Sequence, residues 1–289
     1  MSTELTLASG MSLAEAIGMG GAETKSSMGM PRLTIIHNGI MGTMDVGGKK
    51  IKTEVIPAGA YKYTPNSETT IYSVNPEVRI FAFREQWTRW DNEQEKMLKS
   101  VMADDVKGDL KDNNGGFNLG RPSGYVQDFQ SLPQETKDIM RAVKRTKVVF
   151  GMIKFSDATD EAGNPVEGYE EEQPFAIDLK NTASIKSFDN VLRVLKRKNL
   201  LSVQHSFILG ADENQIPTGA KYYSPNYSAG SLVSAITEED KENVFNFLEY
   251  ISYVNEKILA DWAEKNTDSG LSSDDINLVN QFVNVEEAD

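Results

Sequence analysis

The sequence predicts a mainly β protein with peripheral helices, in the α+β class, and three observations lead to this expectation. Short runs rich in β-branched and aromatic residues are separated by Gly, Asn and Pro, which is typical of strands joined by turns. Helical spacing of apolar residues occurs in only a few segments, the longest near the C-terminus. The 289 residues include no cysteine, so a buried core rather than disulfides must stabilise the fold.

The N-terminal half predicts an arm, several strands and a loop. Residues 1–30 are rich in Gly, Ser, Ala and Met, which indicates a flexible arm. A core over residues 31–235 begins with strands expected at 32–37, 50–56, 70–73 and 78–89. Residues 97–130 are rich in Asp, Asn and Gly, and they predict a long mobile loop.

The second half of the core predicts two helices and two strand pairs. Ser131, Pro133 and Gln134 predict a capped helix that ends in Arg141, Lys144 and Arg145. Runs at 146–155 and 175–179 predict a hairpin with a long acidic loop. Ser187 is expected to cap a second helix ending at residues 196–198, and runs at 203–209 and 221–223 predict a last strand pair.

The C-terminal fifth predicts a packed helix and an acidic tail. Apolar residues recur at three- and four-residue steps from Val244 to Trp262, and acidic residues occupy the first turn, so we expect a helix over residues 236–265. Residues 236–289 contain 14 acidic and 3 basic residues, a net charge of -11, out of -13 for the chain. Residues 266–289 are therefore interpreted as a flexible acidic tail that contacts partners or shields a basic surface.

Most catalytic chemistries are absent from the sequence. The chain has only two histidines, His37 and His205, and no phosphate-binding glycine loop, so we expect no catalytic residue, no cofactor and no metal. No stretch is long and apolar enough for a membrane span, and the absence of cysteine fits a cytoplasmic protein. Asp104, Asp105 and the nearby Asp109 and Asp112 leave a magnesium-dependent enzyme open as an alternative.

The strand over 78–89 has the composition of a surface that binds single-stranded nucleic acid. Strict alternation places Val78, Ile80 and Ala82 on one face and aromatic residues flanked by arginines on the other. Rings can stack on bases while cations neutralise phosphates. Buried rings, and cations that offset a helix dipole, would explain the same pattern. The residues predicted to bind nucleic acid are Arg79, Phe81, Phe83, Arg84, Trp87, Arg89, Trp90, Arg121, Tyr125, Lys144, Arg145, Lys147, Phe150, Lys154, Lys196, Lys198, Tyr222 and Tyr223.

A family resemblance points the same way. The segment KRTKVVFGMIKFSD, an acidic loop and FAIDLKNTASIKSFDNVLRVLK together resemble the helix-destabilising single-stranded DNA-binding proteins of tailed phages. The resemblance implies an OB-like β-barrel, a cleft containing Lys144, Arg145, Lys147 and Phe150, and stoichiometric coating of single-stranded DNA without sequence specificity. The best-known relatives carry a cysteine-ligated zinc site, and this chain has no cysteine.

The resemblance also implies partners and a setting. An acidic C-terminus, here Glu286, Glu287 and Asp289, would recruit replication proteins, and the N-terminal arm would serve self-association. The setting would be phage DNA replication, recombination and repair in the host cytoplasm. Two other functions remain open, namely a phage virion or assembly protein and a metal-dependent nuclease.

Overall fold

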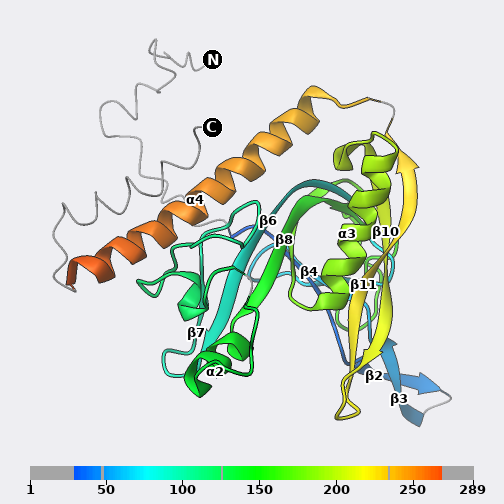
Figure 1. Ribbon diagram of the computed structural model, residues 1–289. Helices are drawn as coiled ribbons and strands as arrows, with labels where there is room; N and C mark the ends of the chain where they lie inside the picture. Colours follow the sequence, from blue (N-terminus) through cyan, green and yellow to red (C-terminus); the bar gives the residue numbers. More distant parts are fainter. Residues whose placement is uncertain (1–28, 47–48, 125, 234, 269–289) are drawn as a thin grey trace, which may run out of the picture. The chain divides into compact units, whose positions relative to one another are not determined.

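A computed structural model describes residues 29–46, 49–124, 126–233 and 235–268. A compact unit begins at Pro31. Within the described ranges, nine strands form one mixed sheet, two strands form a separate ribbon, and helices pack against the sheet (Figure 1). The expected class, mainly β with peripheral helices including one at the C-terminal end, is confirmed.

The large sheet has the strand order β11-β10-β6-β8-β9-β1-β4-β5, and β7 pairs with β6 beside this path. All pairs are antiparallel except β1 with β9. The sheet does not close into a barrel, so the finer expectation of an OB-like barrel is not confirmed. The strands are β1 (Arg32–Ile35), β4 (Tyr61–Thr64), β5 (Ile71–Ser73), β6 (Glu77–Asp91), β7 (Lys96–Lys99), β8 (Lys144–Lys154), β9 (Gln173–Leu179), β10 (His205–Gln215) and β11 (Lys221–Leu232), and the ribbon pairs β2 (Ile40–Val46) with β3 (Lys49–Ile56).

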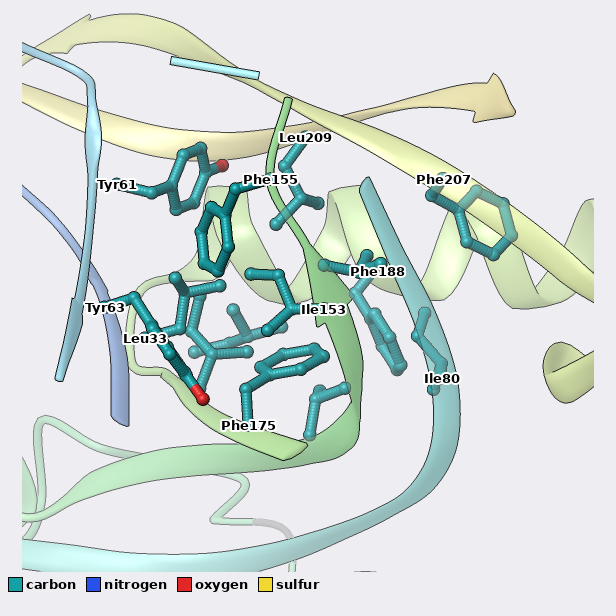
Figure 2. Close-up of a cluster of buried hydrophobic side chains, with 14 of the residues drawn as sticks. Leu33, Tyr61, Tyr63, Ile80, Ile153, Phe155, Phe175, Phe188, Phe207 and Leu209 are labelled. Atoms are coloured by element: carbon teal, nitrogen blue, oxygen red, sulfur yellow. The ribbon is translucent and has the colours of Figure 1, made fainter. Parts of the chain in front are cut away.

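The main core lies between the sheet and the helix α3 (Thr182–Arg197). Phe188 of α3 is fully buried in a cluster of rings and aliphatic side chains from seven strands, including Leu33, Ile80 and Phe175 (Figure 2). Each fully buried large side chain of this kind contributes about 1.5 to 3 kcal/mol. This cluster therefore fixes α3 on one face of the sheet.

The helix α4 (Glu238–Asp268) covers the opposite face. Val149 of β8 belongs to the cluster around Phe188, whereas the next residue, Phe150, packs against Phe247 of α4 at 6.1 Å between ring centroids. Successive strand residues point to opposite faces, so α3 and α4 lie on opposite sides of β8. Figure 1 shows α4 crossing β6 and β8.

A β-bulge in β6 changes the predicted alternation. Ile80 pairs with Gly151 and Ala82 with Phe150, which leaves Phe81 as the extra residue. Because a bulge shifts the alternation by one position, Phe81 faces α4 while Phe83 contacts Phe188 of α3. The prediction that Phe81 and Phe83 share one face is therefore wrong.

The described residues of the segment 97–130 form bridges and tight turns rather than an extended solvated loop. The segment begins within β7, and Asp112 is fully buried, accepting backbone hydrogen bonds at both carboxylate oxygens, from Gly116 N at 3.0 Å and Leu119 N at 2.7 Å. The segment also contacts α4, where Lys265 Nζ donates to the Asn113 carbonyl at 2.7 Å. The Asp and Asn residues that suggested a solvated loop instead satisfy backbone groups in tight turns.

The ends of the helices differ from the sequence prediction. Helix α2 (Gln134–Ala142) has Pro133 rather than Ser131 at its N-cap, and Lys144 already belongs to β8. Helix α3 begins at Thr182, where the Asn181 side chain accepts a hydrogen bond from Ser184 N at 2.8 Å, and not at Ser187. The predicted hairpin pairing of the two runs that became β8 and β9 is confirmed, and the predicted last strand pair, β10 with β11, is confirmed and is antiparallel.

Candidate nucleic-acid interface

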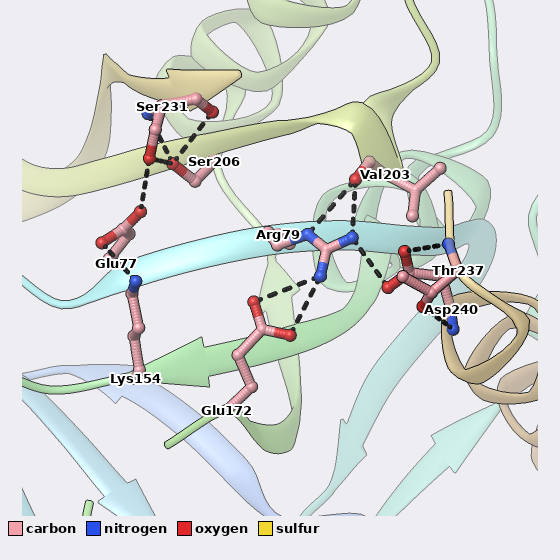
Figure 3. A network of polar contacts seen from close by, with 9 residues as sticks. All are labelled: Glu77, Arg79, Lys154, Glu172, Val203, Ser206, Ser231, Thr237 and Asp240. Atoms are coloured by element: carbon pink, nitrogen blue, oxygen red, sulfur yellow. Dashed lines mark hydrogen bonds and ion pairs between the residues drawn. The ribbon is translucent and has the colours of Figure 1, made fainter. Parts of the chain in front are cut away.

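Arg79 is committed to an internal network rather than to a surface. Its guanidinium contacts Asp240 of α4 at 2.7 Å and Glu172 at 3.1 Å, and Nε and Nη2 donate to the Val203 carbonyl (Figure 3). The Arg79 side chain is 12% exposed and that of Asp240 only 6%. Asp240 also accepts from Thr237 N, so one arginine joins β6 to the first turn of α4.

Of the three phenylalanines predicted to stack on bases, Phe81 and Phe150 are buried and Phe83 is half-buried. Phe81 and Phe150 contact Phe247 of α4, and Phe83 contacts Phe188 of α3. Phe81 and Phe150 lie beneath α4 and have no free face for a base, and Phe83 lies on the α3 side of the sheet, so the structure corrects the prediction of one open aromatic surface on β6 and β8.

Two basic residues of β8, the exposed Arg145 and the buried Lys147, form an ion cluster around the buried Glu85. Arg145 makes a two-pronged contact with Glu85 of β6, with Nε to Oε2 at 2.9 Å. Lys147, 5% exposed, lies 3.2 Å from Glu85 and also bonds to Asp189 of α3. The hydrogen bond and attraction to Glu85 raise the pKa of Arg145. These cations therefore compensate carboxylates within the fold.

Several other predicted residues contact groups of the protein itself. Arg121 lies 4.7 Å over the Trp87 ring and donates to the Met140 carbonyl, so it covers the face that a base would use. Trp90, 53% exposed, is the ring of the predicted β6 set that is open to solvent. Three of the remaining predicted residues contact a carboxylate: Arg84 pairs with Asp104, Lys154 with Glu77, and Tyr223 with Glu213. Lys144 is exposed and donates a hydrogen bond to the Arg141 carbonyl. Arg89 and Tyr222 are half-buried. Tyr125 and the tail residues Glu286, Glu287 and Asp289 lie outside the described residues.

Helix α3 and its C-cap residue carry exposed basic side chains without an acidic partner in the described part of the chain. Within the ranges that the structure describes, no salt bridge involves any of five basic residues on this helix, all of them exposed. The one acidic residue of α3, Asp189, is bonded to Lys147. We call this surface the α3 basic face; its residues are Lys186, Arg193, Lys196, Arg197 and Lys198.

Two grooves flank the α3 basic face. The first, of about 330 Å³, runs between α3 and the β10–β11 hairpin and is lined by Asn190, Val194, Lys198 and by the rings of His205, Phe207 and Tyr227. The second, of about 440 Å³, lies on the other side of α3 and is lined by Phe83, Lys196 and residues 199–202. Figure 1 shows α3 beside the β10–β11 hairpin.

The carboxylates considered for magnesium do not converge. Asp112 is buried and engaged with backbone N–H groups, whereas Asp104 is 91% exposed beside Arg84 and Asp105 contacts Lys107. Among the described residues, no group of three or more His, Asp or Glu side chains is arranged to hold a metal ion. No helix in the same ranges is long and apolar enough to cross a membrane.

Comparisons with protein-family models, curated proteins and solved structures found no significant match to this chain. The geometry therefore carries the functional argument. Of the predicted residues, Lys196 and Lys198 belong to the α3 basic face, where Lys196 lines one flanking groove and Lys198 the other, and the strand residues do not form one surface. Sequence reasoning missed Arg193 and the groove at His205. The helical spacing of Asn190, Arg193, Val194 and Arg197 was the available signal for the former.

Proposed function

We propose that this protein binds single-stranded nucleic acid without catalysis, using the α3 basic face and its flanking grooves. One observation carries the proposal: five of the seven basic residues of β6 and β8 pair with carboxylates, whereas none of the five exposed basic residues of the α3 basic face does so in the described part of the chain. A chain of net charge -13 binds a polyanion only where positive charge is concentrated. The α3 basic face provides this concentration.

The connectivity supports an OB-like origin for the sheet. Strands β6, β8 and β9 form an antiparallel meander, α3 follows, and β10 returns to pair with β6 before β11. This order is the one expected for an OB-like core, in which β1 and β4 would be additions at the β9 edge. Coating of single-stranded DNA in phage replication is the form of the function that the sequence resemblance favours, and recruitment of replication proteins by the acidic tail stays a prediction.

A charge-removal variant tests the proposal. Lys196→Gln/Lys198→Gln/Arg197→Gln removes three positive charges from the α3 basic face. For single strands, the slope of log affinity against log salt falls by about 0.7 per lost phosphate contact, so we expect a loss of about 2 in slope. Fluorescence anisotropy with a labelled oligothymidylate at several salt concentrations measures this slope.

A matched control removes the same charge elsewhere. The exposed residues Lys49, Lys50 and Lys52 lie on the ribbon strand β3, away from α3. Their triple Gln variant should bind like the unmodified protein. Equal losses in both variants would mean that only net charge matters, and absence of binding by the unmodified protein would refute the proposal.

The virion or assembly role remains the main alternative. A structural protein would show no salt-dependent affinity for oligonucleotides, so the same titration separates the two functions. A nuclease would instead require gathered carboxylates, and the described Asp104, Asp105, Asp109 and Asp112 are dispersed.

A further inference from the structure

The groove between α3 and the β10–β11 hairpin has an aromatic floor. The His205 ring stacks on Phe207 at 5.1 Å between centroids with an interplanar angle of 25°, and Tyr227 meets Phe207 edge-on at 6.3 Å. His205 is half-buried, so part of its ring faces the groove, whereas Phe207 is 5% exposed. The result is a rigid stack of rings that ends at the groove.

The walls of the groove add polar and apolar groups from α3. Val194 is 49% exposed, although it lies between basic residues on the helix surface. Asn190 lines the groove with an exposed side chain, and Lys198 lies at its end. The groove thus combines stacking surface, an amide and a cation within about 330 Å³.

We propose that this groove holds one base of a bound single strand, stacked against His205, while Arg193, Arg197 and Lys198 contact the adjoining phosphates. The inference rests on the proposed function and adds to it how single strands are selected. Volumes of about 300 Å³ and above are typical of small-ligand sites, and a nucleotide needs an apolar face for its base beside cations for its phosphate. Bases paired within a duplex are stacked on one another and cannot enter the groove.

Histidine NMR tests the inference directly, because the chain has only two histidines. In protein with isotopically labelled histidine, a base over the ring shifts the His205 signals through its ring current. We expect this shift with an oligothymidylate and not with an abasic strand of equal length, which offers the same phosphates. Thymidine monophosphate, added at equal nucleotide concentration, shows whether a free nucleotide suffices. A His37→Ala variant assigns the two signals.

A variant pair supplies the affinity readout. His205→Ala should lower the ratio of affinities for the base-bearing and abasic strands by roughly fivefold or more, as expected for loss of one stacking partner. His37, which accepts a hydrogen bond from Tyr223 N at 3.2 Å, is outside the groove lining, and His37→Ala should leave the ratio unchanged.

The outcomes separate this inference from the function on which it rests. If both strands bind and His205 responds equally to them, the base is elsewhere and the inference fails while the proposed function stands. If neither strand binds, both fail. If the His205 signals shift only with the base-bearing strand, and still do so in the His37→Ala variant, the groove is supported as the base site.

Discussion

The arginine that joins β6 to α4 gives the sharpest stability prediction. Replacing Arg79 with Met keeps a long side chain but leaves Asp240, 6% exposed, without its cation and the Val203 carbonyl without two donors. Removing one partner of a buried ion pair costs about 3 to 5 kcal/mol. Glu172, 32% exposed, can turn to solvent and adds little, so we expect a loss of about 4 kcal/mol in the free energy of unfolding.

The measurement is urea unfolding followed by tryptophan fluorescence, since Trp262 of α4 is buried. Arg84→Met is the matched control, because Arg84 lies on the same strand but pairs with Asp104, which is 91% exposed, and such pairs contribute about 0 to 1 kcal/mol. Arg79→Met/Asp240→Asn should recover part of the loss by removing the orphaned charge. If Arg79→Met costs no more than Arg84→Met, the network does not hold α4 on the sheet and the reasoning is wrong.

Two further predictions concern pH. Burial alone would raise the pKa of Glu77, but hydrogen bonds from Lys154 and neighbouring serines lower it below 4.5. The stability that the ionised Glu77 contributes is therefore present above pH 4.5 and is lost in acid. Glu77→Gln should lower the unfolding midpoint at pH 7, and the difference from the unmodified protein should disappear as the pH falls below 4.5. Burial, together with nearby cations such as Arg32, lowers the pKa of Lys99 below 10.5, so the charged lysine reduces stability at neutral pH and the cost is relieved as pH rises toward 10.5. Lys99→Met should therefore raise the melting temperature at pH 7, by an amount that shrinks in alkaline buffer; an equal or lower melting temperature at pH 7 would contradict this.

The elements of the fold were predictable where local periodicity is strong. The strand over 78–89 and the helix after Thr237 were predictable because burial of one face sets the spacing of apolar residues along each element. The side on which each ring lies was not predictable. The bulge at Phe81 depends on pairing with Phe150 and Gly151, residues far along the chain, and alternation alone carries no signal of it.

The candidate site was harder to predict for a related reason. Composition shows that a strand carries arginines, but not whether carboxylates from other segments meet them. Arg79 finds Asp240 across 161 positions and Arg145 finds Glu85 across 60. The cations left for a ligand are those that the tertiary structure does not neutralise, and only Lys196 and Lys198 among the predicted residues meet that description on α3.

The parallel pairing of β1 with β9 orders events during synthesis. Arg32 and its partner Asp178 are separated by 146 positions, so the first strand of the sheet has no β9 neighbour until most of the domain has left the ribosome. At about 5 to 20 residues per second, this delay is roughly 7 to 30 s. Over that interval one edge of β1 stays unpaired. Rapid elongation or a chaperone would then prevent this edge from pairing with strands of other nascent chains.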